Sequence, residues 1–534
     1  MKNNIFYIFV IAGLFSACTQ SSKHAAQVVQ RDKSITAINA YTQLFLDSAS
    51  MEKFISEASL NDSLANRMRS FYNSRNYEYA WFFNDGIADY ASTFLNMQND
   101  YITYFHDSSL YNPQLQQLFD SVSNIHQRSN TPNNNILKTE LMLTSQFLRY
   151  ARRAYQGSNQ LDAKELEWFI PRKKINPVAV LDSLIKNKGK NVEEYEPVNR
   201  QYNLLKNYLL KYYIIKRNGG LQKMNAEKKS YKLGDSSAAI ALIKKRLLME
   251  GDLTQNDTTG VFDTATQNAV KNFQHRYGLK EDGVAGSSII NEMNKPVDEA
   301  IRKILINMER IRWVPAQPTT DYLLVNIPEF RLHAYEKGNY QWSMNVVVGS
   351  EMHNTVIFTG TLKYVVFSPY WNVPSSILKN EILPAIRRNK NYLAAHNMEW
   401  NGNTVRQKPG SRNSLGLVKF LFPNSYNIYL HDTPSKSLFD ENKRAFSHGC
   451  IRLSEPKKLA VFLLRNDKNW DSQKITKAMN AGKEQYVTLK EPVPVFIGYF
   501  TSWVDRNGKL NFRDDVYGHD KKMSDHLFAT ASLQ

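Results

Sequence analysis

The spacing of apolar residues changes after Arg312, and this change constrains the fold more than any other feature of the sequence. Upstream, apolar residues recur at every third or fourth position, as in amphipathic helices. The clearest run lies on one face of a predicted helix that ends at Gly157, and it comprises Leu137, Leu141, Leu148, Ala151 and Tyr155. Downstream, short segments rich in β-branched and aromatic residues are bounded by Pro, Gly or Asn. The pattern predicts a multidomain α+β chain, with helices first and a mainly-β domain last.

The length and charge of the chain limit its organisation and its partners. With 534 residues it exceeds what a single hydrophobic core supports, so three or four modules are expected. Its net charge is +18, yet lysine and arginine are spread along the sequence and no nucleic-acid-binding motif occurs. We therefore expect no nucleic-acid partner. The charge is explained either by a solvated basic surface or by attraction to an anionic polymer of the cell envelope.

The N-terminus has the features of an export signal. Lys2 precedes a continuous apolar run, residues 5–17, which is too short to span a bilayer. The run resembles a bacterial lipoprotein signal, which implies removal of residues 1–17 and acylation of Cys18. Because Phe15 departs from the commonest form of this signal, ordinary cleavage or an uncleaved anchor stays open. No acidic run follows Cys18, so the chain is expected in the cell envelope, lipid-anchored to a membrane on its periplasmic face.

The segments between the signal and Arg312 are predicted to be helical apart from their connections. Residues 18–40 are polar and are expected to act as a tether. Residues 41–217 have helical spacing and no compact group of acids, histidines or cysteines, which predicts a scaffold domain. After a polar, glycine-containing linker, residues 228–296 predict a small module. Its first helix ends at Gly251, and its second lies between Asp263 and Gly278.

The mainly-β domain is predicted over residues 297–505 and begins with a long helix, 297–312. Its first strands are expected at Tyr322–Ile327, Arg331–Tyr335, Trp342–Val348 and Leu362–Phe367. An interruption at about residues 375–424 combines a helical piece, 376–388, with a loop rich in Gly, Pro, Asn and Arg, and this predicts a lid. Strand character returns at Tyr426–Leu430, and residues 506–534 are expected to form a C-terminal tail.

The predicted chemistry centres on Cys450, the only cysteine besides Cys18. It lies in Ser447-His448-Gly449-Cys450, and His431 closes an apolar strand nineteen residues earlier. A cysteine nucleophile needs a base to form thiolate, and a nearby histidine can accept the proton and later return it. Gly449 lets the backbone approach a substrate carbonyl, so N–H groups around Gly449 and Cys450 are candidates for an oxyanion hole.

The same residue types have other interpretations. An isolated cysteine is often a small buried hydrophobe. His431, His448 and Cys450 are alternative zinc ligands, but no CxxC or HxxxH spacing supplies the remaining ligands, so no metal is expected. Tyr370 and Trp371 either pack in the wall of the site or stack on a sugar. 

The stretches around Cys450 resemble the larger, lid-bearing members of the L,D-transpeptidase family, which carry a helical scaffold and a peptidoglycan-binding domain. The residues that carry the resemblance are His431-Asp432-Thr433-Pro434, Ser447-His448-Gly449-Cys450 with Arg452, Pro369-Tyr370-Trp371-Asn372-Val373-Pro374 and Asn413-Ser414-Leu415-Gly416. The small module resembles the three-helix peptidoglycan-binding domain through Leu233-Gly234-Asp235, Gly260-Val261-Phe262-Asp263 and Asp282-Gly283. This module either binds the wall or is only a spacer.

The resemblance implies a role for each residue of the site. Cys450 is the implied nucleophile and His431 the implied general base. Supporting roles, including the oxyanion hole, are implied for Gly449, His448 and Tyr429, and substrate-binding roles for Arg452, Trp371, Asn372 and Ser447. Departures from the family pattern occur at Val356 and at the basic lid residues Lys408 and Arg412, and none of them is expected to touch the chemistry.

The implied reaction joins two peptidoglycan stem peptides. A donor tetrapeptide forms a thioester with Cys450 and releases D-alanine, and an amine of an acceptor stem then forms a link between third-position residues. No metal or other cofactor is implied, and acylation by carbapenem β-lactams is expected. With water as acceptor the chain would be an L,D-carboxypeptidase, and with a protein amine an anchoring enzyme. A non-catalytic wall-binding lipoprotein is the alternative from a different class.

Overall fold

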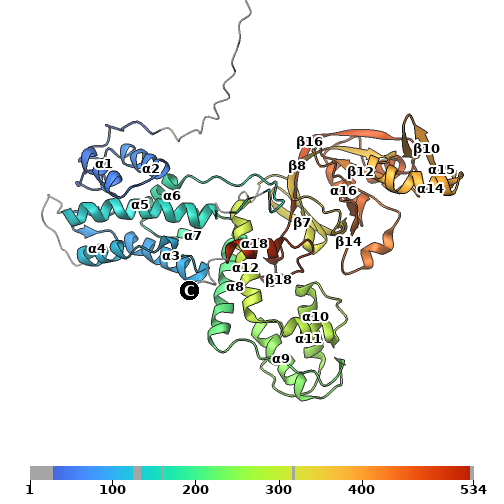
Figure 1. The fold of residues 1–534 in the computed structure, drawn as a ribbon, viewed down its shortest axis with the longest axis horizontal. Coiled ribbons are helices and arrows are strands. Elements are labelled where there is room, and N and C mark those ends of the chain that lie inside the picture. The colour runs from blue at the N-terminus through green and yellow to red at the C-terminus, as the bar shows by residue number, and fades with distance from the viewer. Residues whose placement is uncertain (1–27, 124–133, 159–160, 163, 315–318, 529–534) are drawn as a thin grey trace, which may run out of the picture. The chain divides into compact units, whose positions relative to one another are not determined.

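The computed structural model describes residues 28–123, 134–158, 161–162, 164–314 and 319–528 (Figure 1). The predicted signal and Cys18 lie outside these residues. The chain divides into two compact units. Over the described residues, the first unit holds Met1–Gln98, Leu110–Tyr150 and Pro177–Lys190, and the second holds Asn99–Ser109, Ala151–Asn176 and Asn191–Gln534. The predicted fold class, helices followed by a mainly-β domain, is confirmed.

The first unit is helical, as expected for the scaffold segment. Its helices are α1 (Ser48–Glu57), α2 (Asp62–Asn73), α4 (Pro113–Ser123) and α6 (Pro177–Lys186), with most of α3 (Asp89–Phe105) and α5 (Asn134–Gln156) and a short hairpin of β1 (Phe82–Phe83) and β2 (Gly86–Ile87). The amphipathic run seen in the sequence forms α5, and Gly157 follows it with φ of +82°. A positive φ is what ends a helix most readily, and glycine adopts it without strain.

A buried carboxylate organises the core of the first unit. Glu140 on α5 accepts hydrogen bonds from the backbone N–H groups of Ala80 and Trp81, at 2.7 and 2.9 Å. It also accepts one from the Tyr72 hydroxyl of α2, at 2.8 Å. Burial raises the pKa of Glu140 from 4.5 to about 7. The folded unit therefore holds a proton that the unfolded chain has already released, and stability falls as the pH rises through this interval.

Replacing Glu140 by alanine is expected to destabilise the first unit by about 3 kcal/mol, because two buried N–H groups and a hydroxyl lose their acceptor. Hydrogen–deuterium exchange of peptides covering α2 and α5 measures the loss. Glu140→Gln, which keeps one acceptor oxygen, should exchange at an intermediate rate. Equal protection in wild type and Glu140→Ala would show that the carboxylate contributes nothing to the stability of the unit.

The predicted tether is partly wrong, because residues 28–40 are attached to the first unit. Val29 donates its N–H to the Ser70 hydroxyl at 3.3 Å and accepts from the Asn73 amide at 2.8 Å. The N–H of Asp32 donates to the carbonyl of Asn73 at 2.9 Å. Polar composition predicted exposure, but here the polar groups satisfy backbone groups at the C-terminal end of α2.

In the second unit, two long helices share a core. α8 (Arg200–Arg217) buries Leu205, Leu209 and Tyr212 against a face of α12 (Val297–Trp313) that includes Ile304 and Met308. The short helix α7 (Val192–Tyr195) precedes α8. α12 agrees with the long helix predicted from the sequence. α8 was predicted as the last part of the scaffold segment, yet it belongs to the same compact unit as the β domain.

The small module has helices whose ends agree with the predicted capping residues. α9 (Ala238–Glu250) ends at Gly251 with φ of +86°, and α10 (Thr264–Tyr277) begins after Asp263, whose carboxylate accepts the Thr266 N–H. α11 (Ser287–Met293) and the paired strands β3 (Ser230–Tyr231) and β4 (Ala285–Gly286) complete it. Arg276 of α10 is buried and donates to the carbonyl of Leu510 at 2.8 Å, so the module is fixed to the C-terminal segment.

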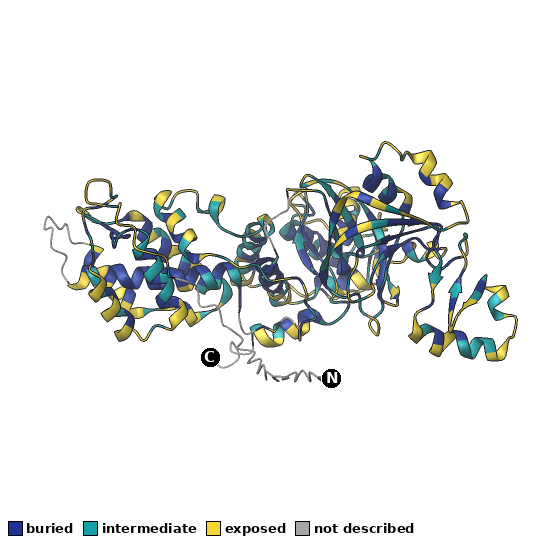
Figure 2. Ribbon diagram, turned by 90° about the horizontal axis from the view of Figure 1, so that it is seen from above, coloured by how far each residue is buried: buried dark blue, intermediate teal, exposed yellow. Residues whose placement is uncertain are grey.

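The β domain is built on a curled sheet that closes on itself. Within the described residues its strand order is β14-β7-β15-β13-β12-β8-β16-β5-β6, and β6 also pairs with β7. The strands are β5 (Tyr322–Asn326), β6 (Arg331–Glu336), β7 (Asn339–Gly349), β8 (Phe358–Phe367), β12 (Val418–Leu421), β13 (Leu430–His431), β14 (Ala445–Ser447), β15 (Ile451–Leu453) and β16 (Gln485–Gly498). Their alternate side chains form the largest core, which α16 (Pro456–Leu464) and α17 (Ser472–Met479) cover, and Figure 2 shows these strands largely buried.

The inserted segment is shorter than predicted at its C-terminal end. It contains α13 (Ser375–Ile377), a π-helical turn η3 (Leu378–Ile382), α14 (Leu383–Arg388), α15 (Tyr392–Ala395), and β10 (Met398–Asn401) and β11 (Thr404–Gln407), which pair with each other and with β9 (Trp371–Asn372). β12 was predicted within the lid but is a central strand, because Val418 and Phe420 are fully buried in the core of the sheet.

The strand predicted at Tyr426–Leu430 is wrong for most of its length. Only Leu430 enters a strand, and Asn427 has a left-handed backbone with φ of +56°. The Asn424 side chain bonds the backbone of Phe422, Tyr426 and Ile428, which folds this segment into a turn. Local side chain–backbone hydrogen bonds compete with the sheet here, although the apolar residues favoured a strand.

The predicted tail is folded over its described residues, 506–528. β17 (Ser502–Val504) and β18 (Leu510–Phe512) form a hairpin, and α18 (His519–Leu527) follows. Asp520 of α18 pairs with the buried Arg310 of α12 at 2.5 Å and accepts from the Thr501 hydroxyl at 2.7 Å. The segment therefore belongs to the framework of the β domain.

Candidate active site

The pairing of two short strands brings the predicted histidine and cysteine together. β13 and β15 run parallel, with Leu430 opposite Ile451 and His431 opposite Arg452. The Ile451 N–H donates to the carbonyl of Tyr429 at 3.1 Å. Cys450 directly precedes β15 and is therefore level with Tyr429, two residues before His431 on the neighbouring strand and on the same face of the sheet. The register of these two strands therefore brings His431 and Cys450, nineteen positions apart in the sequence, into one site.

The tautomer of His431 is fixed by its own backbone neighbour. The Nδ1 atom lies 2.5 Å from the carbonyl oxygen of Asp432, and because a carbonyl only accepts, Nδ1 carries the proton. Nε2 is then the unprotonated nitrogen. The Asp432 carboxylate is itself held by the Leu417 N–H at 2.9 Å and by Lys436 at 2.6 Å. His431 is therefore buried, oriented and prepared to accept a proton.

Two cations on neighbouring strands face His431. Lys419 of β12 is its cross-strand partner on one side and Arg452 of β15 on the other. Burial, followed by the charges of Arg452, Lys419 and Lys436, lowers the pKa of His431 from 6.5 to about 3. The imidazole is neutral at physiological pH, and a positive imidazolium is costly in this environment.

The Cys450 thiol lies among Tyr429, Asn427 and Arg452. Its Sγ is 3.6 Å from the carbonyl oxygen of Asn427, and both the backbone and the hydroxyl of Tyr429 hydrogen-bond to it. Burial raises the pKa of the thiol above its ordinary value of 9.0, although the Tyr429 hydrogen bonds and the charge of Arg452 oppose this shift. The raised pKa of the thiol and the lowered pKa of the imidazole therefore describe a resting site in which both groups are neutral.

The alkylation rate of the free thiol is expected to rise with pH along a single curve whose midpoint lies above pH 9, because the thiol pKa is raised and His431 does not titrate near neutrality. Iodoacetamide modification followed by intact-mass spectrometry measures this profile. A plateau of fast alkylation between pH 5 and pH 8 would instead indicate a preformed thiolate–imidazolium pair, contrary to the neutral pair described above.

The loop that carries the thiol is held by a hydroxyl inside it. The buried Ser447 Oγ donates to the carbonyl of Cys450 at 2.6 Å and accepts the Gly449 N–H at 3.1 Å. Gly449 has φ of +106°, a conformation that glycine alone adopts readily. The Gly449 N–H is thus occupied, whereas no acceptor among the described residues engages the Cys450 N–H. Ser447, predicted to bind substrate, shapes the loop.

The second histidine of the signature lies outside this group. His448 is half exposed, and its Nε2 lies 3.3 Å from the carboxylate of Glu381 in the π-helical turn of the lid. Its ring stacks on His353 with centroids 4.9 Å apart. These contacts join the loop that carries Cys450 to the lid.

Two predicted substrate-binding residues belong to the lid sheet. Trp371 and Asn372 form β9 and pair with Gln407 and Arg406 of β11. Trp371 packs against the small core of the lid, as expected for a residue that forms part of the wall of the site. Asn372 is exposed. None of the contacts described for them involves Cys450 or His431, in contrast to Tyr429 and Arg452. Lys408 of the lid pairs with Glu399 at 3.0 Å, away from the thiol.

Three residues for which the sequence predicted no role lie at the site. Lys419 faces His431, the Asn427 carbonyl faces the thiol, and Thr355 bonds the nucleophile loop. Lys419 was visible as a charged residue in the apolar run Val418-Lys419-Phe420. A lysine is seldom buried in a central strand without a partner, and Lys419 lies 3.5 Å from the carboxylate of Glu484. The other two depend on tertiary contacts that spacing does not reveal.

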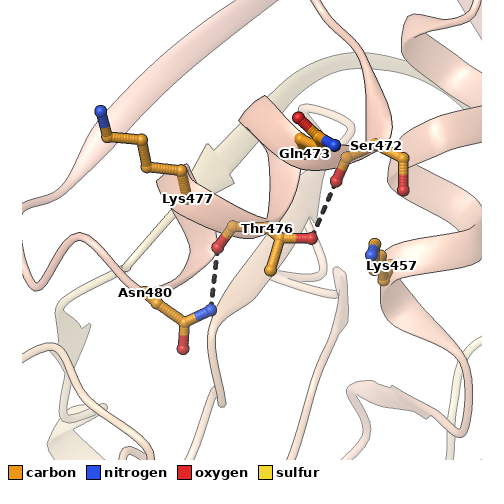
Figure 3. Close-up of a pocket in the computed structure, with 6 residues that line it drawn as sticks. All are labelled: Lys457, Ser472, Gln473, Thr476, Lys477 and Asn480. Atoms are coloured by element: carbon orange, nitrogen blue, oxygen red, sulfur yellow. Dashed lines mark hydrogen bonds between the residues drawn. The ribbon is translucent and has the colours of Figure 1, made fainter.

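Two features of the described residues bear on metal and ligand sites away from Cys450. No group of three or more His, Cys, Asp or Glu side chains in the described part of the chain is arranged to hold a metal ion. His333 is paired with Glu329 at 2.9 Å on the sheet. A cavity of about 440 Å³ lies on α16 and α17 and is lined by Lys457, Ser472, Gln473, Thr476, Lys477 and Asn480 (Figure 3). It shares no residue with the site around Cys450.

Comparison with known proteins assigns three parts of the chain. Residues 320–489 match the L,D-transpeptidase catalytic domain, residues 66–209 a scaffold domain, and residues 236–293 the family described as "Putative peptidoglycan binding domain". A protein of Haemophilus influenzae described as "Putative L,D-transpeptidase" is 30% identical over 244 residues, which cover 42% of this chain and 49% of that protein. The chain thus spans about half the length of the curated relative it matches.

Several solved structures of L,D-transpeptidases have weak overall similarity to the chain. The L,D-transpeptidase of Xylanimonas cellulosilytica is 15% identical, with 51% of this chain and 100% of that chain covered and a TM-score of 0.18. The L,D-transpeptidase of Mycobacterium smegmatis is 13% identical, with 34% and 60% covered and a TM-score of 0.20. L,D-transpeptidase 3 of Mycobacterium tuberculosis is 14% identical, with 34% and 63% covered and a TM-score of 0.19.

The fold and site define a multidomain α+β protein whose mainly-β domain presents a cysteine and a histidine beside an inserted lid. Residues 320–489 of this domain match the model of the L,D-transpeptidase catalytic domain. The resemblance inferred from the sequence, including the scaffold and peptidoglycan-binding modules, is confirmed. In the described residues no helix has the length and apolar character needed to cross a membrane.

Proposed function

We propose that the chain is an L,D-transpeptidase that links the third-position residues of two peptidoglycan stem peptides through a Cys450 thioester. The observation that carries this proposal is the register of β13 and β15, which sets Cys450 level with Tyr429 and on the same face of the sheet as the buried, oriented His431. The match of residues 320–489 to the L,D-transpeptidase catalytic domain supplies the reaction class.

Acylation uses the neutral pair as its starting state. The Cys450 sulfur attacks the carbonyl carbon of the third residue of a donor tetrapeptide while its proton passes to Nε2 of His431. The oxyanion of the tetrahedral intermediate accepts a hydrogen bond from the Cys450 N–H, and the positive charge of Arg452 stabilises it. The intermediate then collapses: the peptide bond breaks, His431 returns the proton to the departing amine, and D-alanine leaves.

Transfer to the acceptor reverses these roles. The side-chain amine of a second stem attacks the thioester carbonyl, His431 accepts a proton from the nitrogen, and the C–S bond breaks. The Cys450 thiolate regains a proton from His431, which restores the neutral pair. The lid favours an amine over water if it limits solvent at the thioester, and its contact with the nucleophile loop through Glu381 and His448 supports that arrangement.

The proposed setting is the cell envelope. Peptidoglycan is the proposed substrate of the catalytic domain and the proposed ligand of residues 236–293. We propose that acylated Cys18 anchors the chain to a membrane on the periplasmic side, since an apolar run of thirteen residues precedes it. Metabolic labelling with a fatty acid should mark the wild type and not Cys18→Ala, and label retained in the variant would disprove this anchor.

The test of the proposed function is product analysis with disaccharide-tetrapeptides. Mass spectrometry should detect a cross-linked dimer formed with loss of one D-alanine, and Cys450→Ala should form none. Release of D-alanine without dimer would replace the proposal by L,D-carboxypeptidase activity. If folded wild type and variant both leave the substrate intact while binding sacculi equally, the non-catalytic wall-binding alternative is correct.

A further inference from the structure

The C-terminal segment, beyond the part that matches the catalytic domain family, reaches back to the nucleophile loop. The hydroxyl of Tyr517 donates to the carbonyl of Gly349 at 2.6 Å and accepts from the Thr355 N–H at 3.4 Å. Tyr517 is itself placed by its own N–H, which donates to the Tyr499 hydroxyl at 2.8 Å. Burial raises the pKa of Tyr517 to about 12, so its hydroxyl keeps its proton and remains a donor.

Thr355 connects this framework to the peptide that precedes the nucleophile. Its side chain is buried, and its Oγ1 accepts the Gly349 N–H at 2.8 Å. The same hydroxyl donates its one proton to the carbonyl of Gly449, also at 2.8 Å. Gly349 must be glycine for this arrangement, since a Cβ there would lie 2.0 Å from the carbonyl oxygen of His353.

The Gly449 carbonyl shares a peptide unit with the Cys450 N–H. This peptide bond is trans, so the carbonyl and the N–H point in opposite directions within one plane. Fixing the carbonyl therefore fixes the direction of the N–H. The Gly449 N–H is already bonded to Ser447, which leaves the Cys450 N–H as the donor that the loop can offer to an oxyanion.

From this arrangement we infer that Thr355, held by Tyr517, is a positioning residue that aims the Cys450 N–H at the substrate oxyanion. The inference rests on the proposed acyl transfer and deepens it. Thr355 touches neither thiol nor imidazole in the described contacts, so its loss should impair the step that creates an oxyanion and spare the reactivity of sulfur. A residue needed only for folding would impair both.

Two reactions of the same thiol separate these roles. Alkylation by iodoacetamide displaces iodide and creates no oxyanion. Acylation by a carbapenem begins with attack on the β-lactam carbonyl, which creates an oxyanion before the ring opens. In full-length Thr355→Val, which keeps the shape of the side chain but lacks the hydroxyl, acylation should slow about 30-fold to 100-fold and alkylation should stay within about twofold of wild type. Tyr517→Phe should slow acylation about fivefold, because Thr355 keeps its own bond to Gly449.

Thr355→Ser is the matched control, because it restores the hydroxyl and should return acylation to within about threefold of wild type. Equal slowing of acylation and alkylation in Thr355→Val, or no slowing of either, overturns the inference. Failure of the proposed function gives a different result. A wild type that is acylated by the carbapenem but does not cross-link tetrapeptides leaves the positioning role measurable, whereas a wild type that forms no adduct overturns acyl transfer and positioning together.

Discussion

Cys450→Ser is expected to lower cross-linking on the order of 10⁴-fold or more, the range seen when a catalytic nucleophile is removed. The substitution changes one atom and preserves the loop, so the loss reflects chemistry. A serine hydroxyl is far less acidic than a thiol, and His431, with a pKa lowered to about 3, is too weak a base to activate it. A thiol is more acidic than a hydroxyl, so a weak base is enough to assist its attack, and a weak base is what His431 provides.

Intact-mass spectrometry after incubation with a carbapenem measures this directly, since the wild type should gain one β-lactam mass and Cys450→Ser none. The chain has two cysteines, and Cys18→Ser provides the matched control. That variant removes the other thiol and should be acylated like the wild type. An adduct that persists in Cys450→Ser and disappears in Cys18→Ser would mean that the wrong cysteine has been assigned as nucleophile.

The helical parts of the fold were predictable because their signals are local. Apolar spacing placed α5, α9, α10 and α12, and Gly251 and Gly278 marked two of the ends. Capping and periodicity act over a few residues, so a single sequence displays them. The pair of Cys450 and His431 was predictable for another reason: the signature around the cysteine is specific, and the strand before the histidine is apolar.

The errors occurred where distant contacts override local preference. Residues 426–429 have the composition of a strand, yet the Asn424 side chain turns the backbone. The segment after residue 505 looks like a tail because its polar residues have no local partners, but Asp520 finds the buried Arg310 of α12. Tyr517 and Thr355 are separated by 162 positions, and no spacing rule joins them. Such pairs emerge only when the sheet and its helices assemble.

The low pKa of His431 also comes from distant contacts and not from a local signal. Nothing local marks its pKa. Burial and the two cations on adjacent strands determine it, and each of these comes from the sheet register. The register therefore sets both the geometry of the pair and its electrostatics, which is why the stability of the β domain and the chemistry of the site depend on the same strands.

His431→Asn is expected to lower cross-linking about 10³-fold, because asparagine can still donate to the Asp432 carbonyl but cannot accept the thiol proton. In the wild type, kcat/KM for acylation should show no fall between pH 8 and pH 5, since the imidazole stays neutral down to about pH 3. Because the folded pKa lies below that of the unfolded chain, His431 also lowers stability as the pH falls from 6.5 toward 3.

Lys419→Met tests the electrostatic part of this argument. Removing one of the cations that oppose protonation should raise the pKa of His431 and move the acid limb of kcat/KM upward, toward neutral pH, with little change at pH 8. Lys436→Met, on the solvent side of Asp432, should move the limb less, because its ammonium is half exposed and screened. A limb near pH 6.5 already present in the wild type, and unmoved by Lys419→Met, would mean that the strand cations do not control the base.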